Sequence, residues 1–313
     1  MTGRAFAPIV LAALACLPFA AGGYVLHVMV IVLIFAVLAA GLDLVTGYCG
    51  QFSFAQGAFW GIGAYTAAIM HRDLGTGFWW HLPAGMVVAG ISGLLLGIPA
   101  LRLRGHFLAI TTIAFQTIVY LGLSQWTAFT GGQYGLSVPQ VGRVTILGLE
   151  LARIEDIRGF YWLTLIVATL CLLLASRLAG SRLGREWVAI RDDETLARAI
   201  GLDATRGKLI AFTASAALAG AAGVLVAHHI RGVSPDDFAI WTSATVLAMV
   251  VLGGRGTLVG PVLGAAVLTA MPEVLRATAD FKLIIYGVLM IVMITVMPEG
   301  VVGRLRRART AAA

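Results

Sequence analysis

Four polar side chains interrupt long apolar runs, where every polar group needs a partner. Ser53 and Gln56 fall in the bend QFSFAQG, and Thr112 and Gln116 lie within the apolar run 106–126. If these runs cross a membrane, such residues are functional candidates by default. Neutral hydroxyl and amide groups bind by donating and accepting hydrogen bonds. We interpret the four as candidates for binding the polar ends of a passing solute, with hydrogen bonding between helices as the alternative.

Motifs for bond-making chemistry are absent from the sequence. It contains no HExxH zinc motif, no GxSxG nucleophile motif and no CxxC pair. Gly207-Lys208 is the one Gly-Lys pair, and it has leucine at 202 and 209, where a phosphate-binding loop requires Gly and then Ser or Thr. The adjacent His228 and His229 would point about 100° apart on a helix, which disfavours a shared metal ion. We therefore expect no catalytic residue, no metal and no cofactor.

A charged island covers residues 184–208 between two apolar runs. From Arg177 to Lys208 the chain carries seven basic and five acidic residues. Acidic residues near the start, Arg198 near the end and Gly201 as a stop predict a short helix from about 192 to 200. Ala197 and Ile200 would share one face of this helix, and Leu196 and Ala199 another, giving a small apolar knob for a soluble partner. A solvated connecting loop is the alternative.

Composition places these features in a membrane. Of the 313 residues 59% are hydrophobic and 12% charged, about half the charge of a typical soluble domain. Apolar runs long enough to cross a bilayer recur along almost the whole chain, so the fold class is an all-α polytopic membrane protein. About ten spans are predicted, with nine as the alternative because the last three runs are short or broken by Gly and Pro: 7–23, 25–45, 54–70, 82–101, 106–126, 160–178, 208–229, 240–254, 258–275 and 282–298.

The N-terminal segment shares features with a secretory signal. Arg4 precedes an apolar run that ends in Ala20-Ala21-Gly22. Because the next run starts at residue 25, we expect the segment to be retained as a span, with cleavage as the alternative.

The basic residues sort to one side of this topology. With ten spans and an inside N-terminus, fifteen of the 22 fall in inside segments and seven in outside segments. Cytoplasmic loops carry the excess of Lys and Arg. Both termini and the island 179–207 are therefore predicted to be cytoplasmic, and the loop 127–159 periplasmic. The same sorting argues against nucleic acid as the reason for a net charge of +7.

The two halves of the chain align with each other at a single offset. The offset that places Ser53 on Ser234 also places Trp60 on Trp241, and it lays the run 25–45 on the run 208–229 without a gap. It covers an odd number of spans, so the two copies would cross the membrane in opposite directions. Spans 2–5 and 7–10 would then form an inverted repeat with the solute path between the halves, which adds Ser234 to the candidate path residues.

Five segments together resemble the permease subunits of branched-chain amino acid ABC importers, the LivM-type branch. The resemblance covers roughly residues 25–303, as one transmembrane permease domain over 1–313, and implies a bacterial inner-membrane protein. It implies a second homologous permease subunit, two ATPase subunits and a periplasmic binding protein as partners. Implied substrates are aliphatic amino acids, with urea or short amides as the family alternative. The segments are GLDLVTGYCGQFSFAQGAFWGIGAYTAA, LRLRGHFLAITTIAF, TGGQYGLSVP, LGREWVAIRDDETLARAIGLDATRGKLIAFTASAALAGAAGVL and VSPDDFAIWTSATVLAMVVLGGRGTLVGPVLGAA.

The resemblance also gives the island a role. Permeases of this class carry a cytosolic motif of Glu-Ala-Ala, three residues and Gly, by which they couple to the ATPase. Counting back from Gly201 places 195–197 at the Glu-Ala-Ala positions, so Ala197 and Gly201 match and Glu194 stands one residue early. Glu194, Ala197, Arg198 and Gly201 are the predicted coupling residues. A stand-alone channel or secondary carrier is the alternative from another class.

Overall fold

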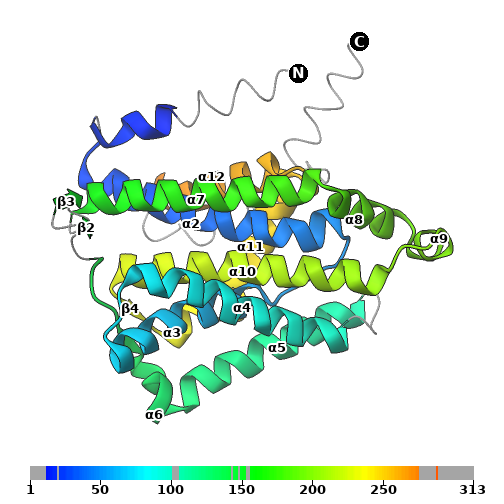
Figure 1. Ribbon diagram of the computed structural model, residues 1–313, viewed down its shortest axis with the longest axis horizontal. Coiled ribbons are helices and arrows are strands. Elements are labelled where there is room, and N and C mark those ends of the chain that lie inside the picture. The colour runs from blue at the N-terminus through cyan, green and yellow to red at the C-terminus, as the bar shows by residue number, and fades with distance from the viewer. Residues whose placement is uncertain are drawn as a thin grey trace.

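Long helices packed side by side form the molecule (Figure 1). The computed structural model describes residues 12–19, 21–100, 106–141, 144–146, 149–152, 156–274 and 287. The long helices are α2 (Gly23–Asp43), α3 (Gln56–Leu74), α4 (Phe78–Ala100), α5 (His106–Gln125), α7 (Ile157–Gly180), α10 (Ala204–Ile230), α11 (Ile240–Gly253) and α12 (Val259–Val274). Shorter helices are α6 (Thr127–Thr130), α8 (Arg182–Asp192), α9 (Glu194–Ala199), the π-helical turn η1 (Leu44–Tyr48), and the 3-10 turns η2 (Gly132–Tyr134) and η3 (Pro235–Phe238).

The multi-pass, all-helical character expected from the composition is confirmed. Within the described residues six segments are long and apolar enough to cross a membrane, and α12 contributes a shorter apolar helix. The six segments are Gly23–Tyr48, Phe78–Pro99, Phe107–Gln125, Ile157–Gly180, Ala204–Ile230 and Pro235–Gly253. Helix α3 fills the predicted run 54–70 but is less apolar than these six. The predicted last run, 282–298, lies outside the described residues apart from residue 287.

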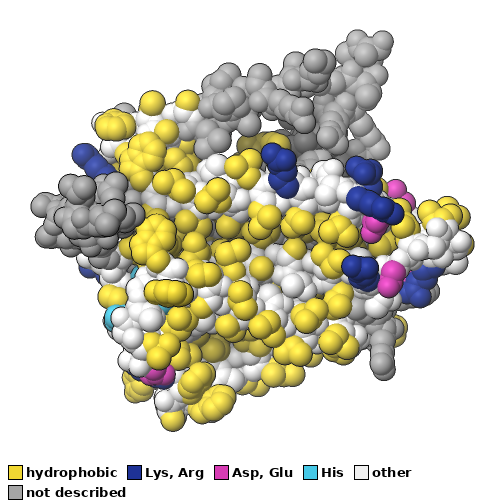
Figure 2. Space-filling view, in the orientation of Figure 1, with side chains coloured by type: hydrophobic (Ala, Val, Ile, Leu, Met, Phe, Trp, Pro, Cys, Tyr) yellow, Lys and Arg dark blue, Asp and Glu magenta, His cyan; other side chains and the backbone are white. Residues whose placement is uncertain are grey.

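Two small strand pairs, which the sequence did not predict, lie at the end of the bundle where α10 finishes. Strand β1 (Leu136–Ser137) pairs antiparallel with β4 (Gly232–Val233). Strand β2 (Val144–Ile146) pairs with β3 (Leu149–Ala152). Helices α8 and α9 lie at the opposite end of the bundle (Figure 1). Figure 2 shows mainly apolar side chains between the ends and a gathering of charged ones around α8 and α9.

Glycines let the central helices approach closely. Helix α10 packs along α3 and α4. A Cβ at Gly220 would come within 2.7 Å of Ala89 in α4, and one at Gly63 in α3 would collide with the Gly220 carbonyl oxygen. Such contacts exclude any larger side chain, so small residues set the spacing of the bundle, as they do in other membrane helices.

Two irregular segments, residues 49–55 and 231–239, interrupt the succession of long helices, and we call them the two breaks. After η1, where the Cys49 amide donates to the Leu44 carbonyl at 3.2 Å, residues 49–55 run without regular structure to α3. After α10, residues 231–239 pass through β4 and η3 to α11.

Two pairs of helices keep the offset found in the sequence. The starts of α2 and α10 are separated by the same interval as Ser53 and Ser234, and so are the starts of α4 and α12. The packing has the same symmetry: α2 packs against α12, and their counterparts α10 and α4 pack against each other.

Candidate functional site

Buried polar side chains from four helices and from the segment before α3 gather around the start of α3. We call them the polar cluster: Ser53, Gln56, Thr112, Gln116, Ser215 and Ser243, each at most 2% exposed. A helix start leaves its first backbone N–H groups without intrahelical partners. Here Ser243 Oγ of α11 accepts from the Gly57 amide at 2.8 Å, and Gln116 Oε1 of α5 accepts from the Ala58 amide at 2.5 Å. Side chains distant in sequence therefore cap α3.

The Gln116 amide joins the two breaks. Its Nε2 donates to the Phe238 carbonyl of η3 at 2.5 Å, while its Oε1 holds α3. The ring of Phe238 lies edge-on to Trp60, with centroids 5.0 Å apart. Both breaks thus meet at one buried amide.

The remaining cluster residues fix the segment before α3. Thr112 Oγ1 accepts from the Phe54 amide at 3.0 Å. Gln56 Nε2 donates to the Leu38 carbonyl of α2 at 3.0 Å, and its Oε1 accepts from Ser215 Oγ of α10 at 3.1 Å. Four of the five predicted path residues are therefore brought together, and each bonds to its own chain. Gln56 and Gln116 thus hydrogen-bond between helices, as in the alternative interpretation, whereas Ser53 Oγ accepts from the Ala55 amide of its own segment at 3.3 Å.

Ser234, the fifth predicted path residue, lies apart from the cluster. Its backbone amide donates to Asp237 Oδ2 at 3.2 Å, which closes a capping box at the start of η3. Its Cα lies beside Gly135, close to the β1–β4 pair. None of its hydrogen bonds within the described residues reaches the cluster.

The predicted helix in the charged island is present as α9. Asp193 Oδ1 accepts from the Thr195 and Leu196 amides at 2.8 and 3.0 Å, which caps the helix start. Gly201 ends the helix with φ +87°. Its amide donates to the Arg198 carbonyl, and the Leu202 amide to the Ala197 carbonyl, both at 3.0 Å. This pair of bonds is the Schellman motif, which favours glycine at the left-handed position.

The expectation that Ala197 faces a soluble partner is wrong. Ala197 is 2% exposed and packs with Ile190, Leu202 and Ala204 of its own chain. Sequence periodicity placed Ala197 on one face with Ile200, but α8 and the start of α10 cover Ala197 and leave Ile200 exposed. The exposed apolar residues are Leu196 and Ile200, at 61% and 68%.

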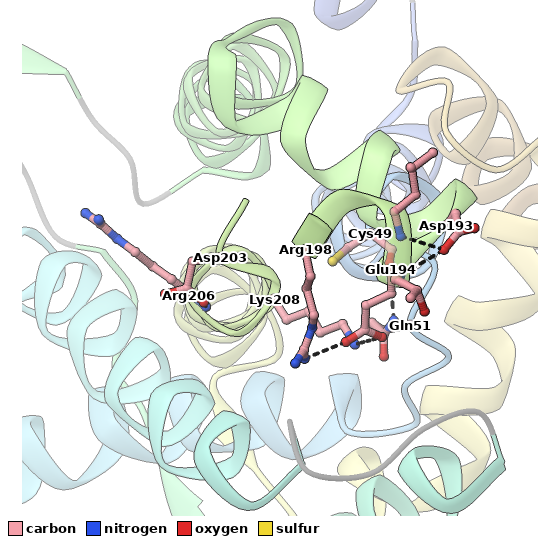
Figure 3. Close-up of polar contacts among 10 residues, drawn as sticks. Cys49, Gln51, Asp193, Glu194, Arg198, Asp203, Arg206 and Lys208 are labelled. Carbon is pink, nitrogen blue, oxygen red and sulfur yellow. Dashed lines mark hydrogen bonds and ion pairs between the residues drawn. The ribbon is translucent and has the colours of Figure 1, made fainter. Parts of the chain in front are cut away.

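An ion-pair network fixes α9 to α10 (Figure 3). The Glu194 carboxylate lies between Arg198 and Lys208, with N···O distances of 2.8 Å to each. Lys208 is 3% exposed, so its charge is buried against this partner. Burial raises the pKa of Glu194, but hydrogen bonds and charge from Lys208 and Arg198 outweigh it and leave the pKa below its ordinary value. Trp187 Nε1 also donates to the Gly207 carbonyl at 2.8 Å.

Sequence reasoning missed two connections of the island. It did not identify Lys208 as buried, although a basic residue near the start of an apolar helix was a usable signal. It also did not identify Arg191, whose Nη1 donates to the Gly47 carbonyl of η1 at 2.8 Å. The π-turn that exposes this carbonyl has no local sequence signature.

Histidines gather at the end of the bundle opposite α9. His81 Nδ1 and His228 Nε2 lie 3.0 Å apart, and His228 Nδ1 lies 3.0 Å from the Pro139 carbonyl. His229 instead stacks on His27, with centroids 4.4 Å apart. Neighbouring histidines thus take different partners. The described residues contain no group of three His, Cys, Asp or Glu side chains placed to hold a metal ion.

Comparison with known proteins identifies the family to which the chain belongs. The family described as branched-chain amino acid transport system, permease component, matches residues 24–294. The chain is 38% identical to the high-affinity branched-chain amino acid transport system permease protein LivM of Salmonella typhimurium, over 90% of this chain and 71% of that protein. It is 37% identical to LivM of Escherichia coli with the same coverage, and 26% identical to LivH of Escherichia coli over 86% of this chain and 91% of LivH. No solved structure matches the chain significantly. The chain belongs to the family of permease components of branched-chain amino acid transport systems, as the membrane-embedded, non-enzymatic subunit of an ABC transporter.

Proposed function

We propose that this permease works in the bacterial inner membrane as an importer subunit for aliphatic amino acids, together with a second homologous permease, two ATPase subunits and a periplasmic binding protein. Residues 179–207 form the cytoplasmic coupling loop, and both termini are cytoplasmic. The loop 127–159 is periplasmic and receives the binding protein. About ten spans cross the membrane.

The observation that carries this proposal is the exposed apolar pair on a rigidly held α9. Leu196 and Ile200 are four residues apart, so they lie on one helix face. Fully burying such a side chain contributes about 1.5–3 kcal/mol. Because the Glu194–Lys208 ion pair holds α9 to α10, and Trp187 holds the preceding helix α8 to α10, a force on Leu196 and Ile200 reaches the membrane helices directly. The pair fits into a groove of the ATPase subunit, and Ala197, Glu194, Arg198 and Gly201 maintain its shape.

The polar cluster and the two breaks support a path at mid-membrane depth. Helices α3 and α11 both start at the cluster, and discontinuous helices are typical of transporter binding regions. The equal offset between the starts of α2 and α10 and of α4 and α12, with the exchanged packing of α2 on α12 and α10 on α4, supports an inverted repeat. In this conformation Ser53, Gln56, Thr112 and Gln116 hold the break between α2 and α3. Rearrangement of the break would release these groups toward the solute.

Reconstitution tests the proposed function. Vesicles carrying the permease pair, the ATPase subunits and ATP should take up labelled leucine, isoleucine or valine only when the binding protein is present outside. Uptake of urea or acetamide under the same conditions, without uptake of the amino acids, would identify the family alternative. Uptake by the permease alone, without ATP or ATPase subunits, would identify a channel or secondary carrier and contradict the proposal.

A further inference from the structure

Arg191 is the last basic residue of α8, and it points from the coupling loop to the membrane helices. Its Nη1 donates to the Gly47 carbonyl at 2.8 Å, 144 residues away in sequence. Its Nε and Nη2 bond to Asp192 Oδ1 at 3.2 and 3.1 Å on the protein surface. A guanidinium group offers five N–H donors in a fixed fork, so one side chain can serve both partners.

Asp43 lies one turn before Gly47 and is fully buried. Its Oδ1 accepts from the Gly256 amide in the turn between α11 and α12, at 2.8 Å. Its Oδ2 is buried without a hydrogen-bond partner among the described residues. Arg191 binds the Gly47 carbonyl one turn away, and Arg255 directly precedes Gly256, but neither guanidinium forms an ion pair with this carboxylate within 4.0 Å. A buried carboxylate oxygen without a partner is costly.

The surroundings of these groups have no spare room. A Cβ at Gly50 would come within 2.5 Å of Arg191 Cγ, and one at Gly256 within 3.1 Å of Arg191 Nη1. A Cβ at Gly47 would collide with the Asp43 carboxylate. Arg191, η1 and the α11–α12 turn are therefore packed as one unit.

Further contacts lead from this unit toward the polar cluster. The Arg255 guanidinium lies 5.4 Å from the centroid of Phe52, in the broken segment 49–55. Ser53 and Phe54 follow directly, and Phe54 is the residue that Thr112 holds. A continuous set of contacts thus leads from α8 to the start of α3.

We propose that Arg191 is a positioning residue that couples α8 to the break between α2 and α3, exchanging its surface partner Asp192 for the buried Oδ2 of Asp43 as the coupling loop moves. This inference rests on the proposed function, because it requires an ATPase subunit that moves the loop. In the structure Oδ2 of Asp43 has no hydrogen-bond partner among the described residues, so it is able to accept from Arg191. In the other state the ion pair would draw η1 and the α11–α12 turn toward α8 and shift residues 49–55.

The experiment compares Arg191→Gln, Asp43→Asn and the double variant in the reconstituted importer. Asp43→Asn keeps an oxygen for Gly256 but removes the charge. Each single variant should bind the ATPase subunits normally, yet lose about tenfold in solute uptake, within the range of typical coupling between sites. ATP hydrolysis should fall much less, so the ATP used per solute rises. The double variant should be no worse than either single one. Arg191→Lys should recover part of the uptake.

Matched controls separate coupling from folding. Arg185→Gln removes an exposed positive charge from the same helix and should behave as wild type. Wild-type ATP use per solute in Arg191→Gln, or losses that multiply in the double variant, would overturn the proposal. A parallel double-mutant cycle on thermal unfolding of the permease in complex with its ATPase subunits and ATP needs no solute, and it should show non-additive effects of the two substitutions. If wild-type vesicles fail to import amino acids while this cycle still shows coupling, the proposed function fails and the Arg191–Asp43 linkage stands; additive effects would reject the linkage itself.

Discussion

Gln116 Nε2 donates to the Phe238 carbonyl across 122 residues of sequence, at 2.5 Å, and so joins one break in the helix bundle to the other. The opposite side of the same amide accepts from the Ala58 backbone. One uncharged side chain thus fixes the relative position of α3 and η3. Movement of either break must change this amide's partners.

Replacing Gln116 by Leu should destabilise the permease and reduce uptake. The substitution leaves the Ala58 amide and the Phe238 carbonyl buried without their partner, and each such group costs about 1–3 kcal/mol. Thermal unfolding of the purified permease measures the loss. Thr117→Val changes an exposed hydroxyl next to it and should have little effect. Equal stability of Gln116→Leu and wild type would show that the amide does not hold the breaks.

The two faces of α9 should respond differently to a charge. Leu196→Glu places the charge on the exposed face, so the permease should keep its thermal stability but lose the ATPase subunits on purification. Ala197→Glu buries a charge among Ile190, Leu202 and Ala204. An unpaired buried charge costs several kcal/mol, so this variant should unfold at lower temperature whether or not the ATPase is present. Normal ATPase binding by Leu196→Glu would contradict the coupling surface.

Gly201 and Gly180 provide a matched pair for the helix end. An added Cβ meets no atom within 4 Å at either position, but only Gly201 has a positive φ, +87°. Gly201→Ala should therefore cost about 1–2 kcal/mol from backbone conformation alone, whereas Gly180→Ala should be close to neutral. Thermal unfolding and ATPase stimulation by the loaded binding protein measure the effects. If Gly201→Ala leaves the unfolding temperature unchanged, the left-handed conformation at residue 201 does not contribute to the stability of the end of α9.

The sequence was sufficient to predict the helices and the charged island, but not the contacts between them. Apolar runs and the capping residues around α9 are local signals, and the structure follows them closely from α2 to α12. The orientation of Ala197 depends on where α8 and α10 lie, which periodicity cannot give. Ser53 and Ser234 were aligned by a single offset, yet the interval between the starts of α3 and α11 is longer than that offset by almost one helical turn. The π-turn and the Arg191 contact depend on tertiary packing and carry no local pattern.

The Glu194–Lys208 pair predicts how the stability of the coupling loop depends on pH. The pKa of Glu194 is lowered in the folded protein, so its contribution is fully present above the ordinary value of 4.5 and is lost as pH falls through the lower, folded value. Glu194→Gln leaves Lys208 buried without its charge partner, which costs about 3–5 kcal/mol. The difference in unfolding temperature between wild type and Glu194→Gln should stay constant above pH 4.5 and shrink below it. Adding Lys208→Met to Glu194→Gln should restore much of the stability, and a difference that does not change with pH would contradict the role of this ion pair.

Topology is the last prediction, because the coupling proposal requires α9 and the loop 127–159 to lie on opposite sides of the membrane. Helix α10 starts next to α9 and ends at β4, which pairs with β1 of that loop. Since α10 is 27 residues long and a helix rises about 1.5 Å per residue, its length is sufficient to cross the bilayer. Reporter fusions within 190–200 and after Thr310 should therefore give cytoplasmic signals, and fusions within 130–155 periplasmic signals. Single cysteines at Leu196 and Tyr134, in a background without the native cysteines, should be labelled from opposite sides by an impermeant maleimide. Labelling of a cysteine at position 196 from the periplasmic side would reject the coupling surface, the assignment of the ATPase partner and the Arg191 proposal together.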